Sequence, residues 1–135
     1  THKRKEQIMA SWEVIRNMLL GIPSYNFELD TENIVSVIVN TESGRDQKVY
    51  ICNEGDSVSI NAAVCKLEDV DLNKLFAAPL MRDLTYGLGV MTNHLAVKHW
   101  QLLEDIDVAE VTKPIIRIAF LADNLESMLT GQDLY

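Results

Sequence analysis

At the start of the chain, apolar residues recur every three or four positions, which is the period of a single helical stripe. This stripe consists of Ile8, Trp12, Ile15, Leu19 and Ile22. Gly21 and Pro23 follow as stop signals, because glycine readily ends a helix and proline cannot continue one. The pattern predicts a first helix from about Lys5 to Leu20.

A run of strands is predicted next. Residues 57–64 alternate strictly between apolar and polar or small side chains, which is the clearest strand signal in the chain. Aromatic and β-branched runs predict three earlier strands, at Tyr25–Leu29, Asn33–Asn40 and Lys48–Cys52. The turns between these segments are short, so we expect an antiparallel meander.

The turn around Gly55 also sets an expected register for its hairpin. If Gly55 is the centre, Cys52 lies opposite Val58, and Cys65 lies opposite Arg45. The two sulfur atoms would then be too far apart for the Cα separation of roughly 4.4–6.8 Å that a disulfide needs. We therefore expect two free thiols.

A short helix and a second hairpin are predicted after residue 66. Asp69 or Asp71 can cap the helix, and Pro79 should end or bend it. Its expected apolar face consists of Leu72, Leu75, Phe76 and Leu80. Residues 85–102 then predict a hairpin that turns at Thr92 and Asn93, since asparagine tolerates the left-handed conformation.

The last segment carries the strongest helical pattern. Asp107 and Glu110 resemble a capping box, and Gly131 is a plausible stop. Pro114 leaves two possibilities open: the helix begins near Thr112, or it kinks at the proline. The stripe that predicts this helix is Val108, Val111, Ile115, Ile118, Ala122, Leu125 and Leu129.

Together these elements predict an α+β fold in the order α-β-β-β-β-α-β-β-α. Helices and strands that segregate in this way favour a single antiparallel sheet with flanking helices over a parallel, doubly wound fold. The length of 135 residues fits one domain spanning residues 1–135. Residues 1–5 are a basic start that we expect to be frayed.

Charge and composition narrow the class of partner. The chain has 12 Lys and Arg against 20 Asp and Glu, and three of the basic residues are Lys3, Arg4 and Lys5. Such an acidic surface repels phosphate backbones, so we expect no nucleic-acid partner. No apolar run is long enough for a membrane span. Two cysteines are too few for a disulfide scaffold, which favours a cytoplasmic protein.

Candidate chemistry is sparse. His94 and His99 are an odd number of positions apart, so they fall on opposite faces of one strand and cannot share a metal. The acidic clusters at 68–71 and 104–110 precede predicted helices, where the helix dipole accounts for them. Gly87 and Gly89 are only half of a dinucleotide-binding fingerprint. We therefore expect no catalytic residues, no metal and no cofactor.

The predicted strands carry apolar residues on both faces. Val35 and Val37 point one way while Ile34 and Ile38 point the other, although an antiparallel sheet with one wet face should alternate more cleanly. Either helices cover both faces of the sheet, or part of the second face meets another chain.

The whole pattern resembles the type III secretion chaperone-like superfamily, which includes the Tir-chaperone and YbjN families. The similar stretch begins with Leu72-Asn-Lys-Leu-Phe-Ala-Ala and leads into a glycine-containing hairpin, Tyr86-Gly-Leu-Gly-Val-Met. An acidic cap, Leu103-Glu-Asp-Ile-Asp, then precedes the helix at 115–129.

This resemblance implies a non-enzymatic cytoplasmic homodimer that binds a segment of a client protein through apolar patches and strand edges. The expected contact residues for the dimer or the client are Phe76, Leu80, Met91 and Trp100. Two other classes stay open from the sequence. One is a small enzyme or ligand-binding domain with a pocket between the sheet and the last helix. The other is an immunity or antitoxin protein that neutralises a basic partner.

Overall fold

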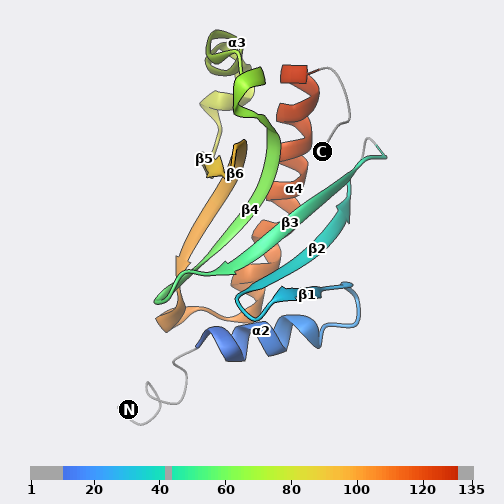
Figure 1. Ribbon diagram of the computed structural model, residues 1–135, viewed down its shortest axis with the longest axis vertical. Helices are drawn as coiled ribbons and strands as arrows, with labels where there is room; N and C mark the ends of the chain where they lie inside the picture. Colours follow the sequence, from blue (N-terminus) through green and yellow to red (C-terminus); the bar gives the residue numbers. More distant parts are fainter. Residues whose placement is uncertain (1–10, 42–43, 131–135) are drawn as a thin grey trace.

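The computed structural model describes residues 11–41 and 44–130, and its elements follow the predicted order (Figure 1). Short 3-10 turns lie on either side of the helix at 72–77 and before the helix at 108–130. The helices and strands are α2 (Trp12–Leu20), β1 (Glu28–Thr31), β2 (Ile34–Asn40), β3 (Asp46–Asn53), β4 (Ser57–Lys66), α3 (Leu72–Ala77), β5 (Gly87–Met91), β6 (His94–Leu102) and α4 (Val108–Thr130).

The strands form one six-stranded antiparallel sheet in the order β1-β2-β3-β4-β6-β5. The predicted α+β fold with a single antiparallel sheet is therefore confirmed. The first four strands make the expected meander. β6 then pairs with β4, which places the β5–β6 hairpin beyond β4 with β5 at the edge.

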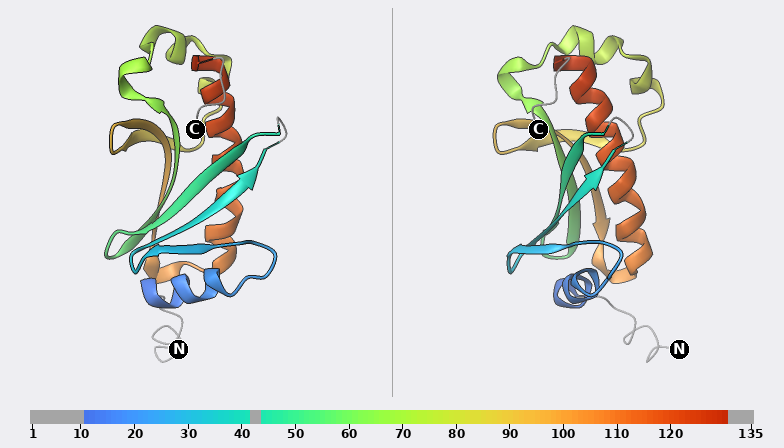
Figure 2. Two further views of the ribbon diagram at one scale, coloured as in Figure 1. Left: turned by 45° about the vertical axis from the view of Figure 1, so that its right-hand side comes forward. Right: turned by 90° about the vertical axis from the view of Figure 1, so that its right-hand side faces the viewer.

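The core lies between α4 and one face of the sheet. Apolar side chains of β2, β3, β4 and β6 point toward α4, and its own stripe meets them. The stripe residues Val111, Ile115, Ile118, Ala122 and Leu125 are all fully buried. α2 and α3 lie at the two ends of the sheet (Figure 2).

The opposite face of the sheet has no helix across it in the described part of the chain (Figure 2). Of the two alternatives for the second face, coverage by helices is therefore wrong for these residues. This face is referred to below as the open face. None of the helices within 11–41 and 44–130 combines the length and apolar character that crossing a membrane requires.

The last helix begins at Val108, capped by Asp107, whose Oδ1 accepts from the Glu110 N–H at 2.9 Å. The choice left open at Pro114 is settled, because the helix begins well before it and Pro114 lies inside. The capping box is only half formed, since Glu110 instead accepts a hydrogen bond from Gln101. The predicted stop at Gly131 lies outside the described residues.

Two predicted boundaries are wrong. Helix α2 begins at Trp12 rather than near Lys5, because the Ser11 hydroxyl caps it by accepting from the Val14 N–H. The predicted basic start lies outside the described residues. The first strand is Glu28–Thr31 rather than Tyr25–Leu29. Tyr25 and Phe27 instead stack on each other and pack against the core ahead of the strand.

The register of the β3–β4 hairpin is displaced by one residue from the prediction. Cys52 lies opposite Ser59, not Val58, because Glu54 N–H donates to the Ser57 carbonyl and the turn centres between Gly55 and Asp56. Gly55 has a φ of +96°, a conformation that glycine adopts without strain. Cys65 does not face Arg45, since pairing ends at Val49 and Ala62. Both cysteines are free.

The short helix α3 is capped by Asp71, which accepts from the N–H groups of Asn73 and Lys74. Its predicted apolar face is only partly buried. Leu75 packs into the core, while Leu72 and Phe76 are exposed. The apolar spacing was read correctly, but α3 sits at the end of the sheet, where it meets only a small part of the core (Figure 1).

Candidate functional site

The open face is built from alternate residues of the central strands. One row across the sheet is Ile34, Cys52, Ser59 and Trp100, and the next is Ser36, Tyr50, Asn61 and Lys98. Small side chains form the floor of this surface and larger ones stand above it. Ser59 and Asn61 are buried although they point away from the core. The face is therefore a mixed surface with aromatic and basic groups over a polar floor.

Trp100 provides a large apolar surface on the open face, with 57% of the residue exposed. Its indole N–H donates to the Ser57 hydroxyl, which orients the ring. Beside it, the Ser59 hydroxyl donates to Glu54 Oε1 at 3.0 Å. Glu54, Ser59, Lys98 and Trp100 border a small pocket of about 190 Å³. An exposed aromatic ring whose polar atom is already satisfied is suited to apolar contact with a partner.

One strand edge beside this face lacks a neighbour in the described chain. β1 pairs with β2 only up to Ser36, while β2 continues to Asn40. Ile38, which is 61% exposed, lies on this unpaired stretch. A groove of about 300 Å³ runs along it and is bordered by Asn26, Glu28, Ser36, Val37, Ile38, Asn40 and Lys48.

Charged groups at this groove form a small network. Asp30 accepts a hydrogen bond from the Ser36 hydroxyl at 2.9 Å. It also lies 4.0 Å from Lys48 Nζ, which is placed over the Tyr50 ring. The Lys48–Asp30 pair is solvated, so it contributes little to stability. It leaves a groove with both charge signs on its walls.

The second sheet edge, at β5, is partly covered by its own neighbour. The Lys98 side chain lies across Gly89, where an added Cβ would come within 2.6 Å of Lys98 Cδ. Its ammonium donates to the Val90 carbonyl at 3.3 Å. A lysine laid over an edge strand is one way in which proteins discourage edge pairing. This edge is therefore less available than that of β2.

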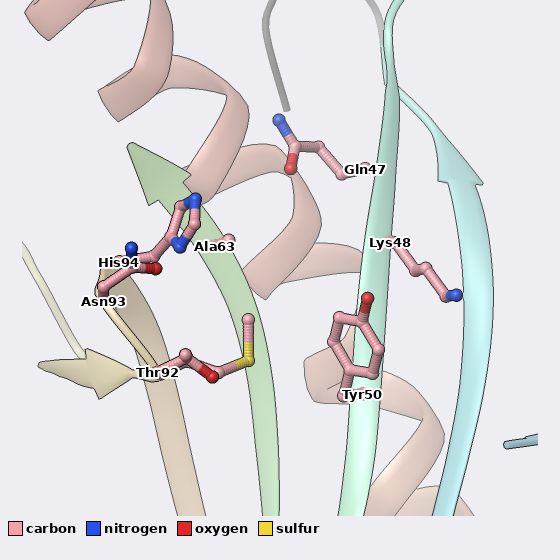
Figure 3. A pocket seen from close by; sticks show the side chains of 8 residues that line it. Gln47, Lys48, Tyr50, Ala63, Thr92, Asn93 and His94 are labelled. Atoms are coloured by element: carbon pink, nitrogen blue, oxygen red, sulfur yellow. The ribbon is translucent and has the colours of Figure 1, made fainter. Parts of the chain in front are cut away.

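A further pocket opens inside the sheet, where β3 and β4 separate (Figure 3). It has a volume of about 390 Å³. Tyr50 and Gln47 face it from β3, while Lys48 points away toward β2. Ala63 of β4 and the β5–β6 turn, Met91 to His94, form the other side. We refer to this pocket as the slot.

The four residues predicted as contacts do not form one cluster. Phe76 is 67% exposed on α3, whereas Leu80 is half-buried and packs against the core. Met91 and Trp100 both face the open side, but at opposite ends of the β5–β6 hairpin, since Met91 pairs with His94. Ile38 and Tyr50 were missed as candidate site residues. The alternation of residues 34–39 already placed Ile38 away from the core.

The described residues offer little for catalysis. They contain no group of three His, Cys, Asp or Glu that could hold a metal ion. His99 faces the core side beside Tyr86, while His94 is at the slot. Burial raises the pKa of the Cys52 thiol, and burial with the nearby Asp69 and Glu126 raises that of Cys65. A reactive cysteine needs the opposite shift.

Comparison with known proteins supports the fold. The chain resembles a chain of the HopA1–SchA chaperone–effector complex, with a TM-score of 0.54 at 11% identity, covering 93% of this chain and 96% of that one. It also resembles a chain of the heterodimeric ExoU–SpcU complex from the type III secretion system of Pseudomonas aeruginosa, with a TM-score of 0.51 at 11% identity, covering 78% and 89%.

The predicted resemblance is therefore confirmed at the level of the fold. At this level of identity the likeness concerns the arrangement of helices and strands. No protein-family model matches the sequence, and the search of curated proteins found no significant match.

Proposed function

We propose that this chain is a non-enzymatic protein-binding module that acts as a chaperone or adaptor for an extended segment of a partner protein. The observation that carries the proposal is the free edge of β2 beside an open sheet face. The likeness to a chain of a chaperone–effector complex supports it. So does the sparse chemistry of the described residues.

The hydrogen-bond register supports strand addition at the β2 edge. Asn53 N–H donates to the Asn33 carbonyl and Thr41 N–H donates to the Arg45 carbonyl. In an antiparallel pair such positions alternate, so odd-numbered residues of β2 bond to β3. The backbone groups of Ile38 and Asn40 consequently point to the free edge. A segment that adds there gains main-chain hydrogen bonds, while Ile38 offers an apolar contact.

The acidic character of the chain favours a neutral or basic client segment. Its formal net charge is −8, which attracts basic segments over long range and repels acidic ones. The same charge keeps a surface with exposed apolar groups in solution.

We further propose that the protein is a homodimer. The contacts we assign to the dimer or the client are Phe76, Leu80, Met91 and Trp100, with Phe76 and Trp100 offering the most exposed apolar surface. Leu80 is half-buried and packs against the core, so it offers less apolar surface to a partner than Phe76 does. A stable dimer should bury about 1,000 Å² or more in total.

A proline at the free edge tests the binding mode. Ile38→Pro removes an N–H that points away from β3, so the β2–β3 pairing should survive. Ile38→Thr is the matched control, because it keeps the N–H and loses a similar amount of apolar surface. The tagged protein and both variants are used to capture partners from host extract, and captured proteins are identified by mass spectrometry.

We expect a defined partner with the parent chain, partial capture with Ile38→Thr and at least about tenfold less with Ile38→Pro, which is roughly 1.4 kcal/mol. Circular dichroism should show that both variants keep their secondary structure. A parent chain that captures no partner and sediments as a monomer would contradict the proposed function. Equal capture by both variants would show that the β2 edge does not take part in partner binding.

A further inference from the structure

The slot has a structural cause in the neighbouring strands. β3 and β4 pair from the turn up to Val49 and Ala62, and then separate. β3 stays paired with β2 as far as Asp46, and β4 stays paired with β6 as far as Lys66. A bulge in β4 between Ala63 and Cys65 supplies an extra residue and bends the strand at this point. The two strand segments that border the slot are its arms, residues 46–48 of β3 and 63–66 of β4. Each arm is thus held in place by the strand on its outer side.

The core keeps the slot from closing. Gln47, on β3, is buried and donates from Nε2 to Oε1 of Glu126 at 3.0 Å. On the other arm, Val64 and Cys65 are both buried. Moving the arms together would break a buried hydrogen bond or pull apolar side chains from the core. The slot is therefore preformed, and a ligand would not have to open it.

The turn at the rim of the slot carries backbone strain. Thr92 has a φ of +56°. This left-handed conformation is unfavourable for a β-branched residue and is ordinarily left to glycine or asparagine. The two-residue turn between Met91 and His94 imposes it, because such hairpin turns need a positive φ at a central residue. Backbone strain of this kind also gathers at binding sites. Thr92 and its neighbours line the slot directly.

We propose that the slot receives an extended segment of the partner protein, inserted between β3 and β4; this rests on the proposed function. The arms face each other without pairing between residues 46–48 and 63–66. An extended polypeptide presents N–H and C=O groups on both of its edges, so it can bond to both arms. This binding mode differs from addition at the β2 edge, because the segment ends inside the sheet.

The lining indicates which segment fits. Met91, Ala63 and Tyr50 provide an apolar wall, and methionine adapts its shape to different partners. Asn93 and Thr92 add polar groups at the rim. A volume of about 390 Å³ is at the small end of ligand pockets, so the slot holds one or two residues of a chain. We infer a leucine- or methionine-containing segment. Its neighbours would be basic because of the net charge of −8 of the whole chain, since the slot lining itself carries no carboxylate.

The test uses random peptides displayed on phage, selected against the full chain and then measured as labelled peptides by fluorescence polarisation. Ala63→Phe fills the slot from its floor. Met91→Ala removes part of its wall and keeps the test valid if the larger side chain disturbs the fold. Val90→Ala is the matched control, because Val90 is the next residue along β5 but points to the opposite face and does not line the slot.

We expect selected peptides to be rich in leucine or methionine beside lysine or arginine. Ala63→Phe should weaken their binding about tenfold or more, the loss for one excluded apolar side chain, and Val90→Ala should leave it unchanged. Hydrogen exchange should show the Lys48 amide protected by bound peptide, since this amide is on the arm that faces β4.

Three other results would overturn the proposal. Peptides that bind Ala63→Phe and Met91→Ala as tightly as the parent chain would show that the slot is not the binding site, while the proposed function would stand. Peptides whose binding the variants weaken without protecting Lys48 would show a side-chain pocket and not strand insertion. A library that yields no binder would contradict the proposed function and the slot together.

Discussion

Gln47 and Glu126 are 79 positions apart in the sequence, yet the amide of Gln47 donates to the carboxylate of Glu126 at 3.0 Å inside the core. One turn earlier in α4, Asp123 Oδ1 lies 3.8 Å from Arg45 Nη1. These polar contacts join the start of β3 to the helix at the level where β3 has separated from β4. At this level α4, and not β4, therefore holds β3 in place.

Removing one partner of the buried pair should destabilise the protein. Gln47→Leu leaves the Glu126 carboxylate without this donor in a buried site, at a cost of about 1–3 kcal/mol. Glu126→Leu should cost a similar amount, because the Gln47 amide loses its acceptor. The double variant should be more stable than the sum of the two single effects predicts. Urea denaturation of all four proteins measures this coupling, and strictly additive effects would mean that the hydrogen bond contributes nothing.

The stripe of α4 predicts a strong contrast between neighbouring residues. Ile118→Ala should cost about 2–5 kcal/mol, because the side chain is fully buried and leaves a cavity, and Leu125→Ala should behave alike. Ile116→Ala is the control, since Ile116 is 40% exposed, and it should cost about 1 kcal/mol or less. Thermal unfolding distinguishes them. Similar melting temperatures for Ile116→Ala and Ile118→Ala would contradict the helix orientation.

The two thiols should be free and slow to react. Cys65 is fully buried and Cys52 is half-buried, and burial raises the pKa of both. A thiol reagent at pH 8 should therefore modify the folded protein slowly, because the thiolate is the reactive form. After denaturation without a reductant, titration should find two thiols. A result of zero would reveal a disulfide that the observed pairing of β3 and β4 does not allow.

The raised pKa values also set a direction for stability at alkaline pH. A folded-state pKa above the unfolded value, near 8.5, means that the folded protein favours the protonated thiol. This contribution is fully present below the unfolded pKa and declines as the pH rises through the folded pKa. Replacing Cys65 by Ala should therefore flatten the decline in urea stability above about pH 8.5. An unchanged slope would assign the decline to other groups.

Adjacent residues of α3 should separate association from folding. Phe76→Asp changes an exposed side chain, so the proposed dimer should dissociate while circular dichroism stays unchanged. Leu75→Asp places a charge in the core and should unfold the chain instead. Trp100→Glu tests the other exposed contact in the same way. Sedimentation should show about twice the 15.3 kDa chain mass for the parent protein. A parent monomer at high concentration would contradict the homodimer.

Several elements were predictable because one face of each is buried against the same core. The period of α4 and the strict alternation of residues 57–64 both record which side chains face the core. Asp107 could also be identified as a cap, and the cap of α3 could be narrowed to Asp69 or Asp71, since the bonds that caps make lie within three residues. Such features depend on local geometry. The element order and the α+β class follow from them.

The candidate site was less predictable, because it depends on what each element meets. Phe76 and Leu75 have similar apolar character, and only the position of α3 at the end of the sheet leaves one exposed. The hairpin register changed by one residue through the choice of turn bonds at Glu54 and Ser57. That single step placed Cys52 opposite Ser59, on the open face, and not opposite Val58.

The sequence by itself determined the helices, the strands, the buried stripe of α4 and the acidic surface, because periodicity and charge are properties of short segments. Only the tertiary structure decided that β6 lies beside β4, that one sheet face stays open and that β3 separates from β4. These outcomes depend on a bulge near Ala63 and on buried contacts such as Gln47 with Glu126. Long-range pairings of this kind leave no local periodicity, since their energy arises only when distant segments meet.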